Sequence, residues 1–202
     1  MIKTIIFDFG DIFINLDKPA TLREMEKYQI NKFPDALINC NLEYEKGLIT
    51  SADFLNHYKS EFDHIGEDEI VNSWNAILVD FPEYRLDFIK NLSAEKKYQL
   101  ILLSNTNEIH IQWVQENVPF FKEFRKCFDA FYLSHEINFR KPDAAIYEFV
   151  LKKHDLNPEE CLFIDDTKEN TEGAAALGIH TWNLDPKKED IVDLFTLKSE
   201  LF

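Results

Sequence analysis

The amino-acid sequence predicts an α/β fold: a parallel sheet with helices on both faces, and a helical segment inserted after the first strand. Three observations predict it. Short, continuously apolar runs end at polar residues, as strands buried on both faces do. Stretches with helical periodicity follow these runs. Residues 16–81 show helical periodicity without a convincing strand.

The first apolar run, Thr4–Phe7, leads directly into Asp8, and Gly10 follows two residues later. The same pattern recurs along the chain, and a weaker fifth run follows Gly178. These runs are residues 98–103 before Ser104, 130–133 before Ser134, 162–164 before Asp165 and Asp166, and 179–182.

Helices are expected between these runs at 107–117, at 142–153, where Pro142 suits a first turn, and at 171–177, where Gly178 suits a helix end. Within the inserted segment, helices are expected at 21–28, after the capping box of residues 50–53, and at 70–78. We therefore predict a core domain of residues 1–15 and 82–202 and a small helical domain of residues 16–81.

Composition indicates a globular protein and excludes several kinds of partner. The formal net charge of −15 repels nucleic acid and anionic lipid, so neither nucleic acid nor a membrane is expected as a partner. A small anionic substrate is compatible, because a site can be locally positive. The 18 Phe predict an aromatic core.

Three widely spaced Cys indicate neither a disulfide framework nor a zinc site. No apolar run has the length of a membrane span, and the chain runs from Met1 straight into a strand without a signal peptide. We expect a cytoplasmic protein, and a monomer.

Polar groups gather where the predicted strands end. Ligands of open α/β sheets bind beyond the carboxyl ends of the strands, where Asp8, Ser104, Asp165 and Asp166 are expected, with Lys141 close by. Carboxylates this close need a cation to remain ionised, and oxygen ligands favour a hard ion such as Mg²⁺. Taken singly, each residue also has a structural interpretation, as a helix cap, a turn residue or a surface lysine.

Four motifs in order resemble the haloacid dehalogenase superfamily: residues 5–10, 102–106, 140–143 with Ile146 and Tyr147, and 163–170 with Ala174 and Ala175. The resemblance implies a Rossmann-like core and identifies residues 16–81 as its helical cap. Within this superfamily, the chain is more closely similar to a bacterial subgroup that includes α-D-glucose-1-phosphate phosphatase. The similar residues are 104–107, 132–134, 140–142, and 165–166 with Asn170 and 172–174.

The resemblance implies a magnesium-dependent phosphatase for small phosphorylated metabolites such as sugar phosphates. Asp8 would be the nucleophile that forms an aspartyl-phosphate. The other implied roles are Mg²⁺ binding by Asp8, the Gly10 carbonyl and Asp166, with Asp165 acting through a metal-bound water; phosphate binding by Ser104 and the Asn105 backbone N–H; charge neutralisation by Lys141; and support of the fourth motif by Asn170.

One position departs from the family pattern. Phosphatases of this superfamily usually carry an acid/base Asp two residues after the nucleophile, where this chain has Gly10. Asp11 is expected to point elsewhere. The similar subgroup also carries Gly here, so we expect an active enzyme that favours good leaving groups, such as anomeric 1-phosphates.

Two alternatives remain open. A 2-haloacid dehalogenase also uses an Asp nucleophile and lacks the second Asp, but such enzymes need no metal and lack the pair Asp165–Asp166. A non-catalytic binding protein on this fold would explain Gly10 as a lost catalytic group. If the cap selects the substrate, the candidates on it are Arg23, Tyr44, Glu45, Lys46 and Trp74.

Overall fold

The computed structural model describes all 202 residues and contains one five-stranded parallel sheet. The strand order is β3-β2-β1-β4-β5, so β1 lies at the centre. This arrangement confirms the predicted fold class, including the weak fifth strand. The strands are β1 (Thr4–Phe7), β2 (Gln99–Ser104), β3 (Ala130–Leu133), β4 (Cys161–Asp165) and β5 (His180–Asn183).

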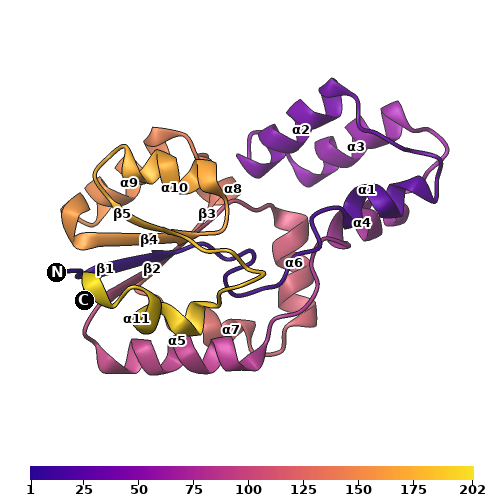
Figure 1. Ribbon diagram of the computed structural model, residues 1–202. Helices are drawn as coiled ribbons and strands as arrows, with labels where there is room; N and C mark the ends of the chain where they lie inside the picture. Colours follow the sequence, from indigo (N-terminus) through magenta and orange to yellow (C-terminus); the bar gives the residue numbers. More distant parts are fainter.

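Helices cover both faces of the sheet, with α9 and α10 on one face and α5, α7 and α11 on the other (Figure 1). Alternation along β1 explains the two layers: Ile5 and Phe7 join the core under α5, whereas Ile6 joins the core under α9. The core helices are α5 (Glu83–Glu95), α6 (Glu108–Asn117), α7 (Phe121–Arg125), α8 (Ser134–Ile137), α9 (Ala144–Lys153), α10 (Lys168–Ala175) and α11 (Leu194–Leu197), with short 3₁₀ turns at Pro158–Glu160, Ile191–Asp193 and Ser199–Leu201.

Helix α5 was not predicted from the sequence. Its buried side chains Leu86, Ile89 and Leu92 recur every three residues and pack beneath the sheet. Phenylalanines fill much of the same layer; for example, the rings of Phe13 and Phe124 lie 4.9 Å apart. The expected aromatic core is therefore concentrated on this face.

The inserted segment, which we call the cap (residues 16–81), forms four helices around a hydrophobic cluster that Ile109 of α6 completes. Thr50 and Asp53 form the predicted capping box. Helix α2 was not predicted, and the boundaries between cap and core stay a prediction. The cap helices are α1 (Ala20–Glu26), α2 (Asp35–Glu45), α3 (Ser51–Glu61) and α4 (Glu67–Asn75).

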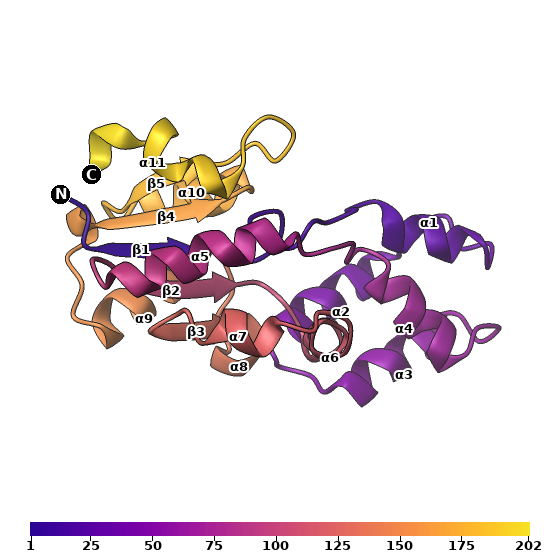
Figure 2. The same cartoon turned by 90° about the horizontal axis from the view of Figure 1, so that it is seen from below.

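The carboxyl ends of the strands point toward the cap (Figure 2). The two chain segments that connect core and cap run side by side, with backbone hydrogen bonds from Asn15 N to Asp80 O at 2.8 Å and from Val79 N to Asn15 O at 3.1 Å. No helix is long and apolar enough to span a membrane.

A second contact joins α4 of the cap to α6 of the core. The Trp74 ring stacks on His110 with centroids 5.2 Å apart, and Trp74 Nε1 donates to Asn107 Oδ1 at 3.2 Å. His110 Nε2 lies 3.1 Å from the Trp74 carbonyl and His110 Nδ1 lies 3.1 Å from the Asn107 amide nitrogen. These partners fit a neutral imidazole that donates from Nε2 and accepts at Nδ1.

Acid should weaken this contact. Burial lowers the pKa of His110 to about 4, whereas an unfolded chain protonates histidine at about pH 6.5. The His110 contribution to stability is therefore complete above about pH 6.5 and is lost as the pH falls toward 4, by up to about 3 kcal/mol. His110→Gln should flatten this part of the pH profile in urea unfolding. The same substitution at exposed His57 is the control, and an unchanged slope in His110→Gln would contradict the assignment.

Candidate active site

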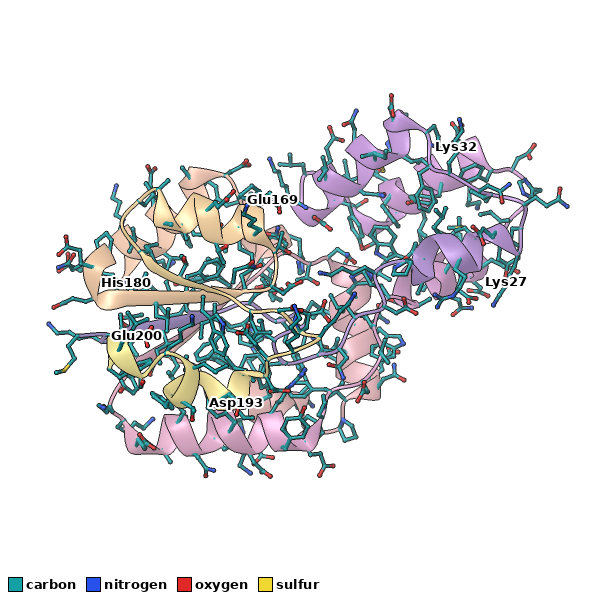
Figure 3. All side chains as sticks on the ribbon, viewed as in Figure 1. Lys27, Lys32, Glu169, His180, Asp193 and Glu200 are labelled. Carbon is teal, nitrogen blue, oxygen red and sulfur yellow. The ribbon has the colours of Figure 1, made fainter.

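A cavity of about 400 Å³ opens beside the carboxyl ends of β1, β2 and β4, where open parallel sheets bind ligands. In Figure 3 one of its lining residues, Glu169, lies at the end of α10 nearest the cap. The cavity is lined by Asp8, Gly10, Leu16, Lys18, Asn105, Arg140, Pro142, Asp166, Thr167, Glu169 and Asn170.

Lys141 is the only lysine whose side chain is fully buried, and it lies between two carboxylates. Its Nζ is 2.8 Å from Asp8 Oδ1 and 2.7 Å from Asp165 Oδ2. Burial by itself lowers the pKa of Lys141, but the charges of Asp165 and Asp8, with the hydrogen bond to Asp165, outweigh it and raise the pKa above its usual value. The ammonium is therefore charged, next to Asp8.

Asp165 is fully buried, and protein donors engage both of its oxygens. Oδ1 accepts from Thr167 N at 2.8 Å, and Asn170 Nδ2 lies 3.1 and 3.0 Å from Oδ1 and Oδ2. Together with Lys141, these donors hold the Asp165 carboxylate behind the cavity. Asp165 itself is not one of the lining residues. Asn170 thus contacts Asp165 directly.

The side chain of Asn105 holds the backbone of Lys141. Its Oδ1 accepts from Lys141 N at 2.9 Å and its Nδ2 donates to Lys141 O at 2.9 Å. Sequence reasoning assigned only the backbone N–H of Asn105, because pairing between two distant loops leaves no local signal. The loop after β2 therefore positions the lysine that faces Asp8.

Ser104, like Lys141, is a predicted phosphate-binding residue that is buried and does not line the cavity. It is the last residue of β2, is 2% exposed and is not among the residues that line the cavity. Its hydroxyl has the Asn105 carbonyl as a partner at 3.5 Å. Of the three predicted phosphate-binding residues, Asn105 lines the cavity, Lys141 contacts Asp8 from beneath it, and the Ser104 hydroxyl has no contact with Asp8.

Asp8 directly follows β1 and continues its pairing with β4, since Asp8 N donates to Ile164 O at 2.9 Å. Its Oδ1 makes the ion pair with Lys141 without the angles of a hydrogen bond, so this buried oxygen lacks a hydrogen-bond donor. Burial raises the pKa of Asp8 to about 7, while the charge of Lys141 opposes the rise and that of Asp165 adds to it. A second cation would favour the ionised form of Asp8.

The carboxylates can supply a site for that cation. Asp8, Asp165 and Asp166 each place one oxygen within 4.8 Å of the others. Burial raises the pKa of Asp166, and the contact with the Lys18 ammonium offsets part of this rise. Because oxygen ligands and a buried acceptor without a donor suit a hard divalent ion, this donor set fits Mg²⁺.

Asp11 does not replace the carboxylate missing at Gly10. Asp11 has a left-handed backbone with φ of 53°, and its Oδ1 accepts from Leu16 N at 2.9 Å. Its Oδ2 lies 3.3 Å from Lys18 Nζ, and Asp11 does not line the cavity beside Asp8. Lys18, which also contacts Asp166, was missed by sequence reasoning, because its loop shows no motif.

The cap residues considered as substrate contacts separate into two groups. Tyr44 and Trp74 are buried in the cap core, and Arg23 pairs with Asp17 at 2.6 Å. The side chains of Glu45 and Lys46 instead form ion pairs with residues of the core domain. Glu45 Oε2 lies 2.6 Å from Arg140 Nε, and Lys46 Nζ lies 2.9 Å from Asp143 Oδ2.

Removal of the buried ammonium should destabilise the fold. Lys141→Met leaves Asp8 and Asp165 buried without their shared cation, so the free energy of unfolding in metal-free buffer should fall by about 3 kcal/mol or more. Denaturant unfolding measures the change. Lys168→Met, which breaks an exposed ion pair with Glu172, is the control and should change the free energy by less than about 1 kcal/mol. Equal losses of unfolding free energy in the two variants would show that the buried ion pairs of Lys141 contribute no more to stability than an exposed one.

Comparison with known proteins places this geometry in a family. The haloacid dehalogenase-like hydrolase family matches residues 2–178. D-ribitol-5-phosphate phosphatase of Bacteroides thetaiotaomicron is 28% identical over 195 residues, covering 90% of this chain and 91% of that protein. Acyl-CoA dehydrogenase family member 10 of mouse is also 28% identical, over 96% of this chain but only 19% of its own length.

Solved structures of HAD family enzymes are also similar to this chain. A HAD family enzyme of Bacteroides thetaiotaomicron in complex with magnesium has a TM-score of 0.86 and 34% identity, covering 96% of this chain and 98% of that one. A HAD-like hydrolase of Porphyromonas gingivalis has a TM-score of 0.81 and 26% identity, covering 98% and 97%. An L-2-haloacid dehalogenase, with a TM-score of 0.61 and 16% identity over 98% and 99%, shares the fold alone. The chain therefore belongs to the haloacid dehalogenase-like hydrolase family.

Proposed function

We propose that the protein is a magnesium-dependent phosphatase that hydrolyses small phosphate esters of polyols or sugars through an aspartyl-phosphate on Asp8. The observation that carries the proposal is the contact of Asp8 with the buried, charged Lys141, at the edge of a polar cavity that Asp166 also lines. A carboxylate nucleophile and neutralising cations are what phosphoryl transfer requires.

Each nearby residue has a role in this scheme. Asp8 attacks phosphorus, and Lys141 neutralises the charge that nucleophile and phosphate bring together. Asn105 keeps Lys141 in place through its backbone. The Ser104 hydroxyl and the backbone N–H of Asn105 are proposed to bind phosphate oxygens, as the family resemblance implies.

The residues proposed to hold Mg²⁺ are Asp8, the Gly10 carbonyl and Asp166. When bound, the ion supplies positive charge to the phosphate and orients it for attack. Asp165, proposed from the sequence to act through a water on the metal, has both oxygens occupied, so we assign it mainly to holding Lys141. Asn170 supports Asp165.

The relatives support this proposal. D-ribitol-5-phosphate phosphatase of Bacteroides thetaiotaomicron is similar over nearly the whole chain. The HAD family enzyme of the same organism has been solved in complex with magnesium and inorganic phosphate. Dehalogenation is the weaker alternative, because the acidic pair Asp165–Asp166 suits a metal and the dehalogenase structures share only the fold. A non-catalytic binding protein would not need the nucleophile and lysine in contact.

The phosphatase proposal predicts inorganic phosphate release that needs both metal and Asp8. With D-ribitol 5-phosphate, α-D-glucose 1-phosphate and p-nitrophenyl phosphate as substrates, Asp8→Asn should lower kcat by about a thousandfold or more. Asp63→Asn, on an exposed loop of the cap, is the matched control and should retain wild-type turnover. Full turnover by Asp8→Asn, or turnover after chelation of the metal, would contradict the proposal, and release of halide from 2-haloacids would favour the dehalogenase.

Gly10 predicts a dependence on the leaving group. With no acid at position 10 and Asp11 engaged elsewhere, departure of the alcohol depends more on its own acidity. The subgroup resemblance favours an anomeric substrate for the same reason, because the leaving oxygen of a sugar 1-phosphate is more acidic. The kcat/KM for α-D-glucose 1-phosphate should therefore exceed that for D-glucose 6-phosphate in phosphate-release assays. Equal or faster turnover of the 6-phosphate would contradict this and indicate another proton donor.

A further inference from the structure

The side chain of Arg140 lines the cavity beside Asp8 and is held from two sides. Its Nε donates to Glu45 of the cap at 2.6 Å, and its Nη1 donates to the Lys141 carbonyl at 2.9 Å. A guanidinium has five N–H donors, and these bonds use two of them. The remaining donors, including both on Nη2, have no acceptor in the protein.

The cap segment that carries Glu45 is fixed on the core, beside the loop that carries Arg140. Asn138 Nδ2 donates to the Lys46 backbone carbonyl at 2.9 Å, a bond that does not need the Lys46 side chain. At Gly47, with φ of 65°, a Cβ atom would lie 2.0 Å from the His135 carbonyl, so the two backbones touch. Figure 1 shows α2 of the cap ending close to α8 of the core. Glu45 therefore approaches Arg140 from a defined position.

The cavity itself suits a polar ligand. Leu16 and Pro142 are its only apolar lining residues, and the others offer carboxylates, amides, a hydroxyl and cations. Its volume of about 400 Å³ lies toward the small end of ligand pockets. A leaving group bound here therefore has several hydrogen-bonding side chains within reach, which hydroxyl oxygens can use.

We propose that Arg140, oriented by Glu45, is a specificity-determining residue that donates hydrogen bonds to hydroxyl oxygens of the leaving group. The selected substrate class is then a phosphate ester with several hydroxyls, such as a polyol or sugar phosphate. This assignment rests on the proposed function, since it places the phosphate beside Asp8. An ester without hydroxyls leaves these donors, on a side chain that is partly buried, without the hydrogen bonds that a polyol supplies, so the two classes of ester bind differently.

A purely structural role for Arg140 makes a different prediction. Through its bond to the Lys141 carbonyl, Arg140 could act only by positioning Lys141. Every ester would then lose the same factor when Arg140 is removed, because Lys141 faces the phosphate that all substrates share. The ratio of kcat/KM between two esters, compared in wild type and variant, therefore distinguishes the two roles.

The experiment measures kcat and KM for D-ribitol 5-phosphate and for p-nitrophenyl phosphate, whose leaving group carries no hydroxyls in these positions. Variants are Arg140→Ala, Arg140→Lys, Glu45→Ala and, as the matched control, Lys46→Ala. The control removes a neighbouring ion pair between the same two segments, and its residues do not line the cavity.

Arg140→Ala should lower kcat/KM for the polyol ester about tenfold to a hundredfold, mainly through KM, and lower that for p-nitrophenyl phosphate less than about threefold. Arg140→Lys should restore little, because lysine lacks the planar fork that Glu45 orients. Glu45→Ala should show the same selective loss at smaller size, and Lys46→Ala should show none. Equal losses for both esters would overturn the proposal.

Binding supplies a readout that does not depend on turnover. In Asp8→Asn with Mg²⁺, calorimetry should show that Arg140→Ala weakens binding of D-ribitol 5-phosphate about tenfold or more and leaves that of inorganic phosphate nearly unchanged. If the wild type hydrolyses no ester, the proposed function fails, and this binding difference alone then decides the role of Arg140. Equal weakening of both ligands, or none, would overturn it.

Discussion

Lys141 carries a positive charge in a position that solvent does not reach, and the site is arranged around it. An ammonium loses several kcal/mol of hydration when it is buried, so it needs anionic partners at short range. Asp8 and Asp165 provide them at 2.8 and 2.7 Å. The same contacts place Asp8, the proposed nucleophile, because its carboxylate lies against an ammonium that the fold holds in position. Thr167 and Asn170 then occupy the free positions on Asp165.

This arrangement links the sheet to the cap. Asn105, at the end of β2, binds the backbone of Lys141 on both sides, and Arg140 binds its carbonyl. Arg140 in turn pairs with Glu45 of α2. A continuous set of hydrogen bonds therefore runs from the centre of the sheet to the cap segment that faces the cavity. The proposed selection by the cap and the proposed chemistry at Asp8 therefore depend on one loop, residues 138–143.

The parts of the fold that sequence predicted are those with local signals. The strand that precedes Asp8 is a continuous apolar run between polar residues. The Thr50–Asp53 capping box is recognised from four consecutive residues. Helix α5 was missed because its apolar side chains, such as Leu86 and Ile89, are interspersed with polar residues. Helix α2 was missed because Ile38 and Leu42 are exposed, which blurs the helical pattern.

The residues of the candidate site also divide into those with a local sequence signal and those without one. Asp8, Lys141 and Asp166 stand in motifs, and the structure brings them together. The roles of Lys18, Arg140 and the Asn105 side chain depend on contacts between loops distant in the chain, which no local pattern encodes. The buried position of Ser104 likewise follows from packing around the end of β2.

The most direct test of the account is mass spectrometry of the protein quenched in acid during turnover of p-nitrophenyl phosphate with Mg²⁺. A phosphoryl group on the peptide that contains Asp8, absent from Asp8→Asn, is the predicted result, because an aspartyl-phosphate survives acid better than neutral solution. Steady turnover by the wild type with an unmodified Asp8 peptide, or a phosphoryl group on a different residue, would contradict Asp8 as the nucleophile and with it the role assigned to Lys141.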